Sequence, residues 1–90
     1  MKYYIPTNIR REHIIQAIEE VIRRGYDKKR ESRKYDILYN GKRFPPKVVI
    51  TIANKFANGE PLDHSKFSGG ESFANKFLQE RGFEILRKSL

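Results

Sequence analysis

Residues 34–46 read KYDILYNGKRFPP, and this stretch decides the fold. Two short runs rich in strand-forming residues flank Asn40-Gly41, the pair favoured in a two-residue type I′ hairpin turn. The two prolines that follow cannot donate hydrogen bonds to a strand ladder, so the hairpin is expected to end there. The stretch therefore predicts a β-hairpin that is followed directly by another element.

A two-residue turn fixes the register of the hairpin. The predicted pairs are Tyr39 with Lys42, Leu38 with Arg43, and Ile37 with Phe44. Side chains alternate between the two faces of a strand, so we expect one face toward the core and one toward solvent. The expected core face carries Tyr35, Ile37, Tyr39 and Phe44, and the expected outer face carries Asp36, Leu38 and Arg43.

A helix is predicted on each side of the hairpin. The upstream helix should run from about Ile9 to Arg24, with Asn8 as N-cap and Gly25 as the stop. Its apolar residues recur at helical spacing: Ile14, Ala17, Ile18, Val21 and Ile22. The downstream helix should begin at Pro46, which suits a first helical position, and end at Gly59. Its expected buried face comprises Val48, Val49, Ile52, Ala53, Phe56 and Ala57.

The last third of the chain predicts a third helix and a strand. The Ser-x-x-Glu spacing of Ser68 and Glu71 is typical of a capping box that opens a helix, and Gly82 should end it. The expected core side of this helix holds Phe73, Ala74, Phe77 and Leu78. Residues 83–86 alternate and should join the hairpin. We therefore expect one α+β domain over residues 1–90, of order α-β-β-α-α-β, with a three-stranded antiparallel sheet packed on helices.

Positive charge is concentrated in one segment. The chain has a net charge of +8, and residues 23–47 hold ten basic and three acidic residues, a net charge of +7. Local excess charge indicates a polyanion, whereas a solvated basic loop without a partner is the plainer interpretation. Residues 26–33 have no apolar period and should form an exposed, mobile loop.

We predict that double-stranded DNA is the partner. Basic residues of the loop should hold phosphates, those of the hairpin should approach a groove, and Lys47 should lie near the backbone. The candidates are Lys28, Lys29, Arg30, Arg33, Lys34, Lys42, Arg43 and Lys47. Two rivals stay open: a protein-interaction module that docks a nuclease or motor subunit, and an RNA-binding domain.

Two further features have a structural and a functional interpretation. Tyr35 and Tyr39 are candidates to stack on a base, although burial in the core explains them at least as well. Residues Ser68, Gly69 and Gly70 offer backbone N–H groups to a phosphate at a helix start, although a helix cap also explains them.

The composition gives little support for a catalytic site, a metal site or a membrane-spanning segment. There is no cysteine, and the two histidines, His13 and His64, are not part of a metal-ligand spacing. We therefore expect no catalytic residue, no metal and no cofactor. No apolar run is long enough to span a bilayer, and the N-terminus has no signal-peptide core, so we expect a cytoplasmic protein without a membrane partner.

Several of these motifs together resemble a known domain. The hairpin with Pro45-Pro46-Lys47, then Gly59-Glu60-Pro61-Leu62, residues 67–71 (FSGGE) and residues 82–85 (GFEI) are similar to the N-terminal head domain of McrA-like HNH endonucleases. The resemblance spans about residues 9–86. It implies a role in recognising DNA for the restriction of modified cytosine or phosphorothioate DNA, in which other domains read the modification or cut. The chain departs from the family pattern because it shows no HNH nuclease, motor or second reader domain. We therefore expect it to be either an excised N-terminal fragment or a free-standing member of the family.

Overall fold

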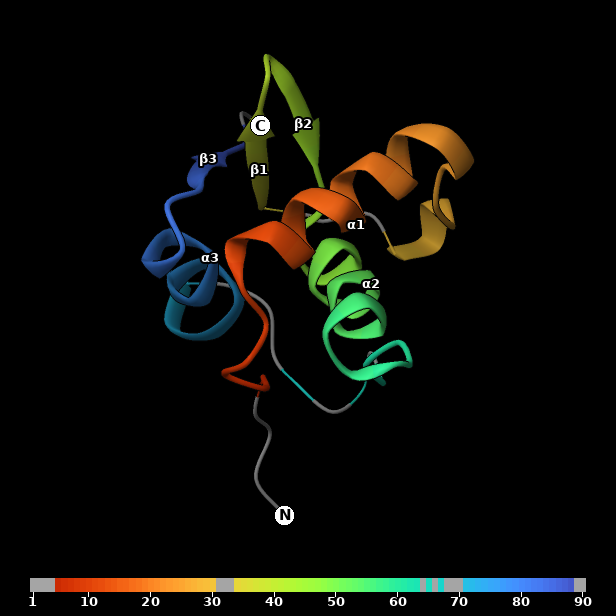
Figure 1. Ribbon diagram of the computed structural model, residues 1–90. Helices are drawn as coiled ribbons and strands as arrows, with labels where there is room; N and C mark the ends of the chain where they lie inside the picture. The colour runs from red at the N-terminus through yellow and green to blue at the C-terminus, as the bar shows by residue number, and fades with distance from the viewer. Residues whose placement is uncertain (1–4, 31–33, 64, 66, 68–70, 89–90) are drawn as a thin grey trace.

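The fold was analysed in a computed structural model, which describes residues 5–30, 34–63, 65, 67 and 71–88 (Figure 1). The helical elements are α1 (Arg11–Arg24), the 3-10 turn η1 (Lys28–Arg30), α2 (Pro46–Asn58), the π-helical turn η3 (Glu71–Asn75) and α3 (Lys76–Glu80). The strands are β1 (Tyr35–Tyr39), β2 (Lys42–Phe44) and β3 (Glu84–Arg87). They form one antiparallel sheet of order β2-β1-β3, which confirms the predicted α+β fold.

The hairpin has the predicted turn and register. Asn40 and Gly41 both adopt positive φ, at 50° and 77°, as a type I′ turn requires. The observed pairs are Ile37–Phe44, Leu38–Arg43 and Tyr39–Lys42. β3 then pairs with the free edge of β1, so that β1 is the central strand.

The core lies between the sheet and the two long helices. Ile37 and Phe44 from the hairpin belong to the same buried cluster as Ile14 and Ile18 of α1 and Val49 of α2. An ion pair between Lys55 and Glu20 joins α2 to α1 at the edge of this core. Figure 1 shows α1 crossing beside α2, with the hairpin projecting away from both.

The start of α1 differs from the prediction. The helix begins at Arg11, and Asn8 does not cap it; its side-chain amide exchanges hydrogen bonds with that of Asn58 at the end of α2 (2.6 and 3.1 Å). Ile9 is fully buried before the helix begins. His13 Nδ1 accepts the backbone N–H of Arg10 (2.9 Å), which gives this histidine a structural task at the first turn.

Three apolar side chains predicted to be buried are exposed. Ile22, Phe73 and Phe56 expose 53%, 45% and 36% of their surface. Ile22 and Phe73 lie at the margins of their apolar stripes, and Phe56 lies near the C-terminal end of α2, so a core this small does not cover them. The polar Asn54, predicted to lie off the buried face of α2, is buried instead because its amide donates to the Glu60 carbonyl (2.9 Å) and accepts from Asn58 (2.6 Å).

Two predictions about exposed residues also need correction. Asp36, expected on an outer solvent-facing surface, is buried, because Arg43 (3.9 Å) and Lys88 (3.8 Å) cover its carboxylate. Tyr26, expected in a fully exposed loop, is partly buried and packs against the core.

The third helix is shorter than predicted. The described chain enters it through the π-helical turn η3, and only residues 76–80 are α-helical. Ala74, Phe77 and Leu78 are buried as expected. The predicted capping box rests on Ser68, which lies outside the described residues.

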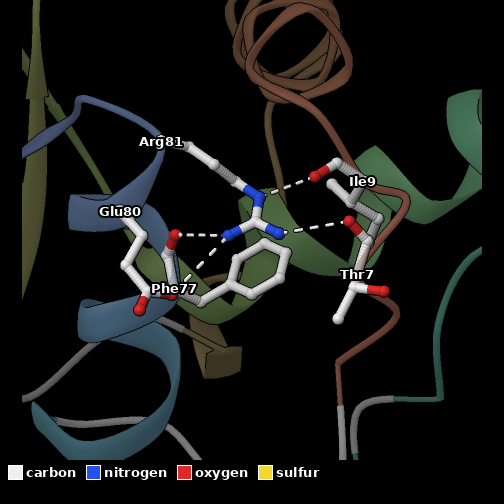
Figure 2. A network of polar contacts seen from close by, with 5 residues as sticks. All are labelled: Thr7, Ile9, Phe77, Glu80 and Arg81. Carbon is white, nitrogen blue, oxygen red and sulfur yellow. Dashed lines mark hydrogen bonds and ion pairs between the residues drawn. The ribbon is translucent and has the colours of Figure 1, made fainter.

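A partly buried arginine joins α3 to the segment before α1 (Figure 2). The Arg81 guanidinium donates to the backbone carbonyls of Ile9 (2.6 Å), Phe77 (3.0 Å) and Thr7 (3.2 Å). It also lies 3.4 Å from the centre of the Phe77 ring, in cation–π contact. Burial lowers the pKa of Arg81, an effect that the nearby carboxylate of Glu80 partly offsets.

Candidate nucleic-acid interface

The first group of candidate cations surrounds the short turn after α1. The Asp27 carboxylate accepts the backbone N–H of Lys29 (3.0 Å), and the Arg30 N–H donates to the Asp27 carbonyl (2.9 Å). These bonds shape a tight turn that leaves Lys28, Lys29 and Arg30 exposed. Lys28 lies over the ring of Tyr26, 4.7 Å from its centre.

Lys47 joins this turn from the first turn of α2. Its ammonium lies 4.8 Å from the centre of the Phe67 ring and is partly buried. Burial lowers the pKa of Lys47, and the positive charge of Arg30 lowers this pKa further. The fold thus brings together two cations that are 17 positions apart in the sequence. We call Lys28, Lys29, Arg30 and Lys47 the turn group.

The second group lies on the hairpin and comprises Lys34, Lys42 and Arg43, which we call the hairpin group. Lys42 follows the type I′ turn at the tip, and Lys34 precedes β1; both side chains are exposed. Arg43 points to the outer face of the sheet, where its guanidinium pairs with Asp36 but keeps 53% of its side chain exposed. The positive charge of Arg43 is therefore partly neutralised by the Asp36 carboxylate.

The two groups occupy different parts of one small molecule. In Figure 1 the hairpin tip is at the top, and the turn lies to the right, beyond the end of α1. The described residues measure 33 × 29 × 26 Å along their principal axes. One turn of B-form DNA is about 34 Å long, so both groups fit within about one turn of a duplex.

The two candidate stacking tyrosines have different surroundings. Tyr39 packs against the core, and its ring centre lies 6.0 Å from that of Phe83 at an angle of 49°. Tyr35 is half-buried and lines an open cleft between the sheet and α3. Of the two rings, Tyr35 is the one that borders open space.

Four of the candidate residues lie outside the described residues: Arg33, Ser68, Gly69 and Gly70. Their roles remain predictions. Within the part of the chain that the structure describes, there is no group of three or more metal-ligating side chains, and no helix is long and apolar enough to cross a membrane.

A family model described as "ScoMcrA-like, N-terminal head domain" matches residues 7–87 of the chain. The chain belongs to this family. The match extends over nearly the whole chain and confirms the resemblance seen in the sequence. No curated protein and no solved structure matches the chain.

Sequence reasoning about this head domain missed two structural arginines. Arg11 donates to the Arg81 carbonyl (3.0 Å) and lies 4.4 Å from the centre of the Phe83 ring, while Arg81 bonds the start of the chain. Arg81 precedes Gly82, the predicted end of the third helix. A basic residue at that position usually lies exposed and contacts the last carbonyls of its own helix. Nothing local marks its partners, because Thr7 and Ile9 lie more than 70 positions away.

Sequence reasoning also missed the cleft beside Tyr35. Its volume is about 440 Å³, and its lining comes from β1, β3, η3 and α3, of which β1 is distant in sequence from the other three. The sheet contributes Tyr35, Ile85 and Arg87, and the helical segment contributes Asn75, Lys76 and Gln79. No motif links these positions, because the cleft arises only when β3 pairs with β1.

Proposed function

We propose that this head domain binds double-stranded DNA through its turn group and hairpin group, as the accessory domain of a modification-dependent restriction or defence system. Family membership supports the link to McrA-like proteins. In this proposal, other domains or partner subunits cut the DNA. The head domain contributes phosphate contacts and positions the system on the duplex.

One contrast among the cations carries the proposal. Outside the basic segment, Arg11, Lys55, Arg81 and Lys88 are engaged in ion pairs or backbone contacts of the fold, and the exposed cations Arg10, Lys76 and Arg87 are spread over the helices and β3. Inside it, Lys28, Lys29, Lys34 and Lys42 are exposed and form no ion pair with any residue that the structure describes. Exposed cations that form no ion pair and are concentrated on one turn and one hairpin are available to neutralise phosphates.

A fluorescence anisotropy titration tests this function. We would use duplexes of one sequence (unmodified, cytosine-methylated and phosphorothioate) at two salt concentrations. Each neutralised phosphate lowers the logarithm of the binding constant by about 0.9 per tenfold increase in salt. We expect salt-sensitive binding to all three duplexes. Tighter binding to one of them would make the head domain itself a reader of that modification.

A charge variant ties the binding to these residues. Replacing Lys28, Lys29, Lys34 and Lys42 with Gln should reduce the salt slope by about 3 to 4. Arg10→Gln is the control, because Arg10 is exposed at the opposite end of α1 from the turn group. No binding at low salt would refute the DNA function and favour docking to an acidic protein partner.

A further inference from the structure

The cleft between the sheet and α3 has one largely apolar side, which the sheet forms. Tyr35 and Arg87 are direct partners in the β1–β3 register, so their side chains leave the same face of the sheet. Ile85 lies two positions from Arg87 and therefore on that face as well. The tyrosine ring and the isoleucine give the cleft a flat, apolar side of the kind on which a planar group stacks.

The opposite side carries a buried polar group without a partner. Asn75 exposes only 3% of its surface, and its Oδ1 atom receives no hydrogen bond in the structure. A buried acceptor without a hydrogen bond destabilises the folded state, so such atoms call for an explanation. Asn75 is one of the residues that line the cleft, but its Oδ1 atom is itself buried, so the side chain would have to turn toward the cleft to accept a hydrogen bond from an amino group bound there.

Cations and a second amide complete the lining. Lys76 and Arg87 are exposed at the cleft, one from α3 and one from β3, and suit a phosphate group. Gln79 lies three positions after Lys76, on the same side of α3. A stacking face, an unsatisfied acceptor and two cations within about 440 Å³ match the parts of a single nucleotide.

We infer that this cleft takes up an unpaired DNA nucleotide whose base carries an exocyclic amino group, as in cytosine. The inference rests on the proposed DNA binding and specifies which part of the DNA enters the domain. The base would stack on Tyr35 and donate its amino group to Asn75, while its phosphate lies between Lys76 and Arg87. A base that is paired in a duplex cannot enter such a cleft, so the nucleotide must be bulged, flipped or single-stranded.

The position of the cleft fits this inference. Tyr35 directly follows Lys34 of the hairpin group, and the Lys34 carbonyl accepts the backbone N–H of Lys88 (2.7 Å). The basic segment therefore runs into the rim of the cleft. DNA held along that segment would pass the opening.

The test compares three duplexes of one sequence by fluorescence anisotropy: fully paired, with one bulged cytosine, and with one bulged thymine. Stacking of a base on an aromatic side chain is worth about 1–3 kcal/mol, so we expect the cytosine bulge to bind about tenfold tighter than the paired duplex. Thymine has no exocyclic amine and should gain less.

Variants localise the effect. Tyr35→Leu keeps an apolar side chain at the sheet but removes the stacking ring, and it should abolish the preference for the cytosine bulge. Gln79→Ala changes an exposed lining residue and should weaken the preference even if Tyr35→Leu fails to fold. Arg87→Gln removes one of the two proposed phosphate contacts and should weaken binding of the bulged duplex. Arg10→Gln, the same change at an exposed arginine outside the cleft, should leave the preference unchanged.

The outcomes separate this inference from the proposed function. Equal binding of the bulged and paired duplexes, with normal salt sensitivity, would refute nucleotide binding in the cleft but would leave the proposed DNA binding intact. Absence of binding to every duplex would refute the DNA function, and an NMR titration with deoxycytidine monophosphate would then decide the cleft. Shifts of Tyr35, Asn75 and Gln79 resonances would support it, and unchanged resonances would overturn it.

Discussion

At the scale of single residues, arginine has two different tasks in this domain. Arg81 is the clearest structural case, because its guanidinium reaches three backbone carbonyls in a partly buried place. Arg30 is the opposite case, exposed on a turn beside another cation. A net charge of +8 therefore overstates the charge that is free to meet a partner.

Arg81→Ala should lower the free energy of unfolding by about 3 kcal/mol, because it leaves the Ile9 carbonyl and its neighbours without their donor. Arg81→Lys should recover less than half of this loss, since one ammonium cannot reproduce the planar fork of donors. Urea titration measures both. Arg24→Ala, on an exposed arginine of α1, should change stability by less than about 0.5 kcal/mol. A similarly small change for Arg81→Ala would show that the network contributes little.

Lys47 provides a prediction about pH. Burial, and then the charge of Arg30, lower its pKa in the folded state from the ordinary value of 10.5. Between the two pKa values the unfolded chain binds more protons, so folding stability from this group rises with pH in that window. Arg30→Gln should raise the pKa of Lys47, as measured by NMR of its side-chain carbon next to the amine. An unchanged pKa would show that burial alone lowers it.

Residue burial was predictable where a side chain lies at the centre of an apolar stripe and not at its margin. Ile14 and Ile18 are buried as predicted, whereas Ile22 is not, although all three fit the same helical spacing. The spacing of apolar residues indicates which side of a helix faces the core. How wide a stripe of that side is buried depends on the elements that pack against it. Asp36 could not be predicted as buried because Lys88, one of the cations that cover it, is brought near only by the pairing of β3 with β1.

At the scale of elements, the hairpin was predictable in full because its determinants are local. Asn40 and Gly41 determine the turn type, the two-residue turn determines the pairing register, and Pro45 and Pro46 end the second strand. The third helix was predicted less well, since a π-helical turn occupies its first described residues. That turn places Asn75 at the cleft, and the sequence carries no period that distinguishes it from an ordinary helix.

The turn can be tested by replacing Gly41. Its φ of 77° is unfavourable for other residues, while an added Cβ would meet no atom within 4 Å. Gly41→Val should therefore lower stability by about 1–2 kcal/mol through backbone strain alone. Gly41→Asn should cost less, because asparagine tolerates this region. Thermal melting measures both, and equal losses for the two variants would argue against a conformational cause.

At the scale of the whole molecule, size limits how much DNA the domain could contact under the proposed function. Its longest dimension is 33 Å, and the candidate cations are divided between the turn and the hairpin. A single copy can therefore contact about ten base pairs at most. Phosphate contacts carry no sequence information themselves. Under the proposed function, a preference for a modified site would therefore have to come from base contacts at the hairpin or the cleft, or from other domains.

The length of DNA that the domain needs follows from the same dimension. In a series of stem-loop duplexes of increasing length, affinity should rise until the stem reaches about one helical turn and then level off, after correction for overlapping sites. Anisotropy titrations at one salt concentration measure this. A shorter stem can contact only one of the two groups, the turn group or the hairpin group. Replacing Lys42 of the hairpin group should therefore lower the affinity for a short stem less than the affinity for a long one. An affinity that kept rising over two or three turns would instead indicate that several copies bind side by side, and the unit that recognises DNA would then be larger than this domain.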